Sequence, residues 1–139
     1  MVQEEKRSIK LVVGGLAQGK RKLVLAGCQK NNPLVLEASL VVDTKKIEEN
    51  KNQLVIVNHF HLWVRDCLLK GGEPEAEIEA FLEKYQNCVI ISDEIGNGIV
   101  PMEAFEREYR ERTGRILVAL ASRADEVVRV VCGIGQKIK

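Results

Sequence analysis

A glycine-rich segment between a predicted strand and a predicted helix constrains the fold of this chain more than any other feature. Residues 9–13 form a short apolar run suited to a strand, and residues 20–27 carry apolar side chains at helical spacing. The segment that joins them, Gly14 to Arg21, reads GGLAQGKR and fits the spacing GxxxxGK. A strand, a glycine loop and a helix in this order are the context in which that spacing indicates a phosphate-binding P-loop.

The residue types of this loop suit an anion. Glycines let consecutive backbone N–H groups curl around phosphate oxygens, the following helix N-terminus adds positive potential, and Lys20 would reach the terminal phosphates. Arg21 stands where a Ser or Thr hydroxyl normally ligates Mg²⁺, so we assign no metal ligand. A glycine turn without a ligand is the alternative. The candidate nucleotide-binding residues are Gly14, Gly15, Gln18, Gly19, Lys20 and Arg21.

Strand-like and helix-like patterns alternate through the remaining chain. Alternation of this kind predicts an α/β fold: one P-loop NTPase-like domain over residues 1–139, with a mostly parallel sheet between two helical layers. Gly114 lies inside a predicted helix, where it should mark a close approach by another element. The patterns predict strands at 34–42, 54–57, 88–91, 126–132 and 136–139, and helices at 59–70, after Pro74 and at 102–124.

A pair of carboxylates follows the buried strand at 88–91. The segment SDEIGNGIVP, residues 92–101, should therefore lie at the carboxyl end of that strand, where open α/β sheets bind ligands. Asp93 and Glu94 could hold a metal-bound water, orient a substrate hydroxyl or act as a general base. Capping of a turn by Asp93 is the alternative.

A third segment, NHFHLW at 58–63, follows the apolar run at 54–57. P-loop proteins often place a metal-holding Asp at such a strand end, and Asn58 is a poor replacement because it carries no charge. His59 and His61 have no convincing third ligand, and on a helix they would not share a face. A structural or capping role is therefore favoured for both.

Composition and charge limit the expected partners. The formal net charge is +1, so no broad positive field favours nucleic acid or an anionic membrane. The first ten residues do not form a signal peptide, and no run approaches the roughly 18 apolar residues that a membrane span needs. The expected location is the cytoplasm, with neither membrane nor nucleic acid as a partner. The four cysteines lack a CxxC pair and are expected to be reduced, buried small hydrophobes.

Three segments together resemble a known family, the adenosylcobinamide kinase / adenosylcobinamide-phosphate guanylyltransferases. The strongest likeness is in ISDEIGNGIVPMEAFEREYRERTGR and ASRADEVVRVVCGIGQKIK, near the end of the chain. GGLAQGKR is similar to the family's GGxxSGKS loop, and NHFHLWVRDCLL is similar to its DCLTLWLTNLL-like segment. The resemblance spans most of the chain and identifies it as a shortened, divergent member.

The resemblance implies a P-loop α/β fold and phosphorylation of the cobinamide side-chain hydroxyl, followed by guanylyl transfer. It implies GTP or ATP as the nucleotide, with Mg²⁺ left open, adenosylcobinamide (a corrinoid) as acceptor, and either a monomer or a homo-oligomer. Lys20 would then neutralise the transferred phosphoryl group, and Asp93 or Glu94, which match the Asn-Glu of the family's NEVGxGIVP, would position metal or hydroxyl.

Several departures bear on that activity. Gln18 and Arg21 replace loop serines, and Asn58 stands where the family has its strand-end Asp. The family's HRxxRPxxW region, which carries the guanylyl-accepting histidine, is missing from the shortened segment before residue 54. The leading interpretation is a kinase-like protein that keeps nucleotide or phosphate binding and lacks that histidine. The alternative is a noncatalytic protein that binds a nucleotide, a corrinoid or a partner, and a purely structural or regulatory role comes third.

Overall fold

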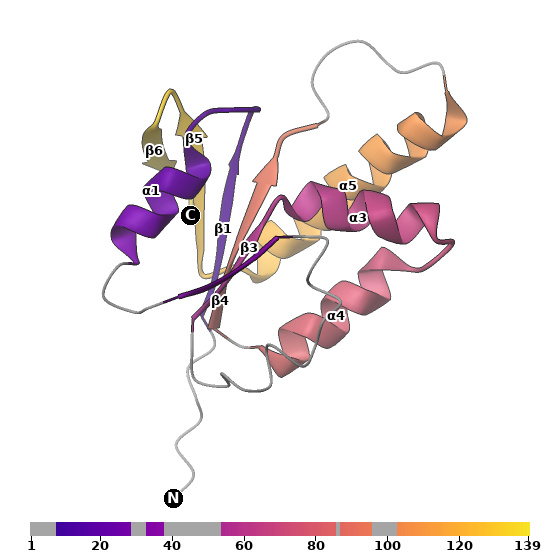
Figure 1. Ribbon diagram of the computed structural model, residues 1–139, viewed down its shortest axis with the longest axis horizontal. Helices are drawn as coiled ribbons and strands as arrows, with labels where there is room; N and C mark the ends of the chain where they lie inside the picture. Colours follow the sequence, from indigo (N-terminus) through magenta and orange to yellow (C-terminus); the bar gives the residue numbers. More distant parts are fainter. Residues whose placement is uncertain (1–7, 29–32, 38–53, 86, 96–102) are drawn as a thin grey trace, which may run out of the picture.

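The described strands form a single sheet in the order β2-β3-β4-β1-β5-β6. The computed structural model describes residues 8–28, 33–37, 54–85, 87–95 and 103–139. Figure 1 shows the sheet with helices on both faces. The strands are β1 (Ser8–Gly14), β2 (Leu34–Glu37), β3 (Val55–Asn58), β4 (Asn87–Asp93), β5 (Glu126–Val131) and β6 (Ile134–Lys137), and the helices are α1 (Lys20–Gly27), α3 (Phe60–Leu69), α4 (Pro74–Lys84) and α5 (Ala104–Arg123).

The central strand is β1, which lies between β4 and β5 and is parallel to both. Its last residue, Gly14, is in register with Asp93, the last residue of β4. β2, β3 and β4 continue the parallel arrangement, and β5 pairs antiparallel with the edge strand β6. The loop after β1 and the carboxylates after β4 therefore meet at the same edge of the sheet, as the sequence predicts.

Successive residues of the central strands point to opposite faces, and each face has its own apolar core. Leu11 packs with residues of α3, α4 and α5, whereas its neighbour Val12 packs with Val24 of α1. Figure 1 shows the same division, with α1 on one side of the sheet and the other three helices on the opposite side. All four residues of β3 are buried, as a strand covered on both faces requires. The predicted three-layer α/β architecture is confirmed.

Most predicted elements appear within one or two residues of their expected ends, but three details differ. The strand predicted at 34–42 is seen as β2, and residues 38–42 lie outside the described ranges, as do Pro101 and Met102. Cys132, predicted as the last residue of a strand, is an exposed turn residue with φ 51°, so it is not a buried hydrophobe. Gly114 is exposed, and a Cβ there would meet no atom within 4 Å. The close approach predicted at Gly114 was therefore wrong.

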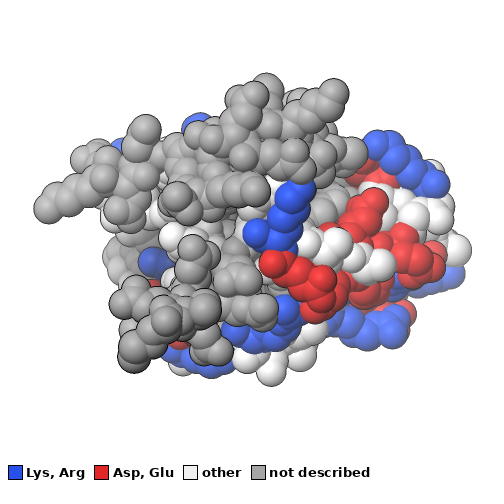
Figure 2. Space-filling view, turned by 90° about the horizontal axis from the view of Figure 1, so that it is seen from below, with Lys and Arg blue, Asp and Glu red and all other residues white. Residues whose placement is uncertain are grey.

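Opposite charges are interspersed on the helical surface. Figure 2 shows acidic and basic side chains side by side on the face that it displays. Arg112 of α5 reaches Glu75 at the start of α4 at 2.6 Å and Glu108 of its own helix at 3.4 Å. None of the helices in the described ranges combines the length and the apolar character needed to cross a bilayer.

Candidate functional site

The GGLAQGKR segment forms a tight loop between β1 and α1. Gly14 has to be a glycine, because a Cβ there would lie 2.5 Å from the carbonyl oxygen of Val130 on the neighbouring strand. Gly19 caps α1 with φ 84°, a left-handed conformation that favours glycine, and its carbonyl accepts the N–H of Leu23. Gly14 and Gly19 thus allow the close approach and the left-handed backbone that this loop requires between β1 and α1.

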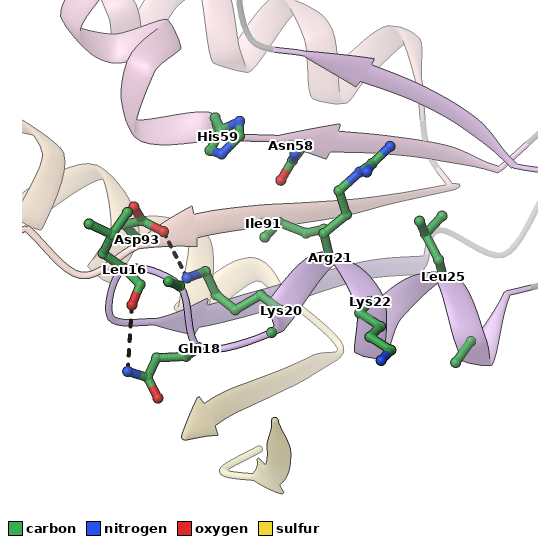
Figure 3. Close-up of a pocket in the computed structure, with 13 residues that line it drawn as sticks. Leu16, Gln18, Lys20, Arg21, Lys22, Leu25, Asn58, His59, Ile91 and Asp93 are labelled. Carbon is green, nitrogen blue, oxygen red and sulfur yellow. Dashed lines mark hydrogen bonds and ion pairs between the residues drawn. The ribbon is translucent and has the colours of Figure 1, made fainter. Parts of the chain in front are cut away.

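Lys20 is a buried cation whose ammonium group is held at the sheet edge. Its side chain is 6% exposed, and Nζ lies 2.7 Å from Oδ1 of Asp93 and 2.6 Å from the carbonyl oxygen of Gly15. Figure 3 shows Lys20 running beneath the loop toward Asp93. Two candidate catalytic residues predicted from separate motifs are thereby brought into contact. These two contacts hold the ammonium group at the end of β4.

His61, for which the sequence favours a structural or capping role, is part of this site. Its Nδ1 accepts the backbone N–H of Asp93 at 3.1 Å, and its Nε2 lies 3.5 Å from Oδ2 of the same residue. Burial lowers the pKa of His61, and the charge of Asp93 opposes this with a smaller effect. A neutral imidazole with its proton on Nε2 fits both contacts. The sequence indicated that His61 follows the end of a strand. It did not show that β4, which ends at Asp93, lies beside that strand, so the contact between His61 and Asp93 could not be predicted.

A second polar cluster lies at the ends of β2 and β3. Glu37 accepts a hydrogen bond from Nδ2 of Asn58 at 3.0 Å, and its other oxygen lies 2.8 Å from Nδ1 of His59. Partial burial acts to raise the pKa of Glu37, but the hydrogen bonds from Asn58 and His59 and the charge of Arg21 lower it below its usual value. Glu37 was missed because it lies inside an apolar run. His59, with φ 55°, occupies the N-cap position of α3 but makes no side-chain capping hydrogen bond there; its ring contacts Glu37 instead.

Glu94 is turned to the other side of β1. Its backbone N–H donates to the carbonyl of Gly14 at 2.8 Å, and its carboxylate pairs with Arg129 of β5 at 3.1 Å. Glu94 does not line the cavity described next. Residues 96–101 of the same predicted segment lie outside the described ranges.

A cavity of about 640 Å³ opens between these groups. The loop and α1 form one wall, Asn58 and His59 form another, and Ile91 and Asp93 lie between them. Figure 3 shows Arg21 rising from α1 toward Asn58 instead of folding into the loop. The cavity is within the size range of small-molecule sites, and the space beside the loop is not filled by Arg21.

The described residues offer little for a metal ion. Within residues 8–28, 33–37, 54–85, 87–95 and 103–139, no three His, Cys, Asp or Glu side chains are placed to share one. Cys67 and Cys88 are poor thiolate ligands, because burial, the largest effect in both, raises the pKa of each thiol to about 12.

Comparison with known proteins decides the family. Residues 30–138 match the family described as cobinamide kinase / cobinamide phosphate guanyltransferase. The chain belongs to this family. The match begins after the loop at 14–21, so the loop's assignment rests on its motif and geometry.

Named relatives agree with that assignment. The bifunctional adenosylcobalamin biosynthesis protein CobU of Escherichia coli (strain K12) is 43% identical over 68 residues, which cover 46% of this chain and 38% of that protein. CobU of Salmonella typhimurium is 43% identical over 67 residues, covering 45% and 37%. CobP of Pseudomonas aeruginosa is 29% identical over 113 residues, covering 77% and 62%. The chain thus spans less than two thirds of the length of these relatives.

A solved structure gives independent support for the fold. The DnaC helicase loader superimposes with a TM-score of 0.51 at 12% identity, covering 88% of this chain and 78% of that one. At this identity the likeness concerns the fold alone. Together with the sheet order and the loop, it supports a P-loop NTPase-like α/β fold, while membership of the cobinamide kinase family rests on the match of residues 30–138.

Proposed function

We propose that this protein binds a nucleoside triphosphate, GTP or ATP, at the loop of residues 15–20 and transfers its terminal phosphoryl group to the side-chain hydroxyl of adenosylcobinamide in the cytoplasm. The observation that carries the proposal is the buried Lys20–Asp93 pair at 2.7 Å, placed where the loop and the cavity meet. The family match of residues 30–138 supplies the reaction class and the acceptor.

The geometry suggests how the two residues would divide the work. Incoming phosphate oxygens carry more charge than one carboxylate, so the ammonium group of Lys20 would leave Asp93 and bind them. Lys20 would then stabilise charge on the transferred phosphoryl group, which is the main source of catalysis in phosphoryl transfer. The released carboxylate of Asp93 would face the cavity with the proton of His61 beside it.

In the transfer step, the acceptor hydroxyl oxygen forms a bond to the terminal phosphorus, and the bond from that phosphorus to the bridging oxygen breaks. The hydroxyl proton passes to the Asp93 carboxylate, which lies at the cavity wall. Glu94 remains paired with Arg129 and would keep β4 and β5 in place at this edge. We assign no step to a metal ion.

We also propose that the guanylyl-transfer step of the family is absent. The sequence has no counterpart of the family's histidine segment, and both histidines of this chain are otherwise engaged. His59 contacts Glu37, and His61 accepts the Asp93 N–H. Incubation with GTP labelled at the α-phosphate, without any acceptor, should therefore yield no protein-bound guanylyl group; a label retained on the protein after denaturation would contradict this.

Calorimetry with ATP and GTP, followed by a phosphorylation assay on adenosylcobinamide, tests the main proposal. The variant Lys20→Gln should weaken triphosphate binding by about tenfold or more, which corresponds to about 1.4 kcal/mol. Lys70→Gln is the matched control, because Lys70 is an exposed lysine at the end of α3 whose ion pair among the described residues is with Asp66 of that helix. Equal affinities for the two variants would overturn the nucleotide assignment.

The competing function is nucleotide binding without turnover. Arg21 in place of a hydroxyl and Asn58 in place of a carboxylate both favour it, since each removes a usual magnesium ligand. Binding of a triphosphate without any phosphorylation of adenosylcobinamide would decide for this alternative. The double change Arg21→Ser with Asn58→Asp should then create activity if those two positions alone had disabled the site.

A further inference from the structure

Arg21 is one of the basic residues that line the cavity. It directly follows Lys20 in the first turn of α1, where P-loops normally carry the Ser or Thr whose hydroxyl binds Mg²⁺. Its side chain lines the cavity and, in Figure 3, extends across toward Asn58 at the end of β3. The guanidinium thus lies on the α1 side of the cavity near the end of β3, and this position offers no Ser or Thr hydroxyl to a nucleotide-bound cation.

The oxygen atoms around this region do not suit a divalent cation. Mg²⁺ requires near-octahedral oxygen ligation, usually with one or two carboxylates. Asp93 is the one carboxylate among the described residues that line the cavity, and the proposed function uses it to take the proton of the acceptor hydroxyl. Asn58 offers a neutral amide whose nitrogen donates to Glu37, and the described residues include no cluster of three metal-ligating side chains. The donor set therefore favours an anion balanced by protein cations.

The charges around the cavity also favour the binding of an anion without a metal ion. The positive charge of Lys20 is balanced by Asp93, so the pair adds no net charge to the cavity. Arg21 and Lys22 both line the cavity, and neither has an ion-pair partner within 4 Å among the described residues. The charge of Arg21 acts on Glu37, which is already in contact with the side chains of Asn58 and His59. A guanidinium without a close partner is available for bidentate binding of phosphate oxygens.

We propose that Arg21 replaces the divalent cation at this site, so that the protein binds a nucleoside triphosphate without Mg²⁺. This inference rests on the proposed nucleotide-binding function and identifies the Arg21 guanidinium as the positive charge that balances the phosphates in place of Mg²⁺. Arg21 would bind oxygens of the β- and γ-phosphates from the α1 side, while the loop amides and Lys20 hold the opposite side. Magnesium that arrives with the nucleotide then adds little to affinity, because its usual protein ligands are absent from the described residues.

The test is the affinity for ATP, and separately for GTP, measured by calorimetry in EDTA and in excess Mg²⁺. The native protein should bind the same nucleotide in both buffers with dissociation constants within about threefold, a difference of less than 1 kcal/mol. Arg21→Ser should lose about tenfold or more in EDTA and recover part of that loss in Mg²⁺, because it restores the hydroxyl. Arg21→Lys should be intermediate, since a lysine keeps the charge but not the bidentate geometry.

Arg115→Ser is the matched control, because Arg115 is an exposed α5 residue paired with Glu111 on its own helix. It should leave both affinities unchanged. Binding by the native protein that appears only in Mg²⁺ would overturn this inference and leave the nucleotide assignment intact. A folded protein that binds neither nucleotide in either buffer would overturn the nucleotide assignment itself. Equal affinity of Arg21→Ser and native protein in EDTA would show that Arg21 does not replace the cation.

Discussion

Gln18 and Cys132, 114 positions apart in the chain, are joined by a 2.7 Å hydrogen bond from the Cys132 backbone N–H to Oε1 of Gln18. The next residue, Gly133, donates its N–H to the Gln18 carbonyl at 2.8 Å. Gly133 also passes close to Gly19, where an added Cβ would lie 3.3 Å from the Gly133 Cα. The turn between β5 and β6 therefore holds the loop from outside, so the shape of the loop depends on the last strands of the chain.

Loss of the Gln18 side-chain acceptor should loosen the loop. Gln18→Met keeps the side chain's length but cannot accept the Cys132 N–H, so hydrogen exchange at that amide should accelerate. The affinity for ATP should fall by about threefold to tenfold, since one hydrogen bond contributes about 1 kcal/mol. Gln136→Met on exposed β6 is the control. Unchanged exchange at Cys132 in the Gln18 variant would show that the turn does not hold the loop.

Neutralising Asp93 should change the affinity for ATP and the rate of phosphoryl transfer in opposite directions. Asp93→Asn removes the counter-charge of a buried ammonium group, so the ligand-free protein should lose about 3 kcal/mol of stability. The affinity for ATP should rise, because phosphate no longer competes with a carboxylate for Lys20. Phosphorylation of adenosylcobinamide should fall by about 100-fold or more.

Thermal unfolding with and without ATP, together with the phosphorylation assay, measures these effects. Glu126→Gln is the control, since its ion pair with Lys10 at 3.6 Å is exposed and should contribute less than about 1 kcal/mol. Weaker ATP binding by Asp93→Asn would contradict the proposed exchange of partners at Lys20.

The buried histidine should make stability depend on pH. Burial lowers the folded-state pKa of His61, so the unfolded chain binds its proton more readily than the folded protein does. This part of the stability is present above the unfolded-state pKa of about 6.5 and is lost as the pH falls below that value toward the folded-state pKa. His61→Asn, which retains an acceptor for the Asp93 N–H, should flatten that part of the curve. Urea unfolding over a pH series measures it, and identical slopes for native protein and variant would refute the assignment.

Two glycines with equally open surroundings should respond oppositely to alanine. A Cβ at Gly114 or at Gly133 would meet no atom within 4 Å, but Gly133 has φ +76° whereas Gly114 lies inside α5. Gly114→Ala should stabilise the protein by about 1 kcal/mol, the difference in helix propensity. Gly133→Ala should destabilise it by about 1 kcal/mol or more, because a Cβ disfavours the left-handed region. Chemical denaturation of both variants checks this, and destabilisation by Gly114→Ala would show that a contact at Gly114 has been overlooked.

Much of the fold could be predicted because the relevant signals are local. The apolar run at 9–13 and the glycine spacing at 14–20 determine a strand, a loop and a helix through steric effects among neighbouring residues. The helices α3, α4 and α5 were likewise expected from their periodicity. The predictions failed where the surroundings of a residue depend on segments far away in the sequence. At Gly114 an added Cβ would meet no atom within 4 Å, and Cys132 lies in an exposed turn.

The motif, the alternation of strands and helices and the resemblance to the cobinamide kinases could all be recognised in the sequence, because each depends on the order and spacing of neighbouring residues. Which side chains contact one another became known from the folded chain alone. β4 inserts between β1 and β3, so Lys20 contacts Asp93 and not Asn58, while Glu94 is directed to Arg129. The physical reason is that strand order depends on the packing of residues far apart in the chain, and that order places each charge at the site.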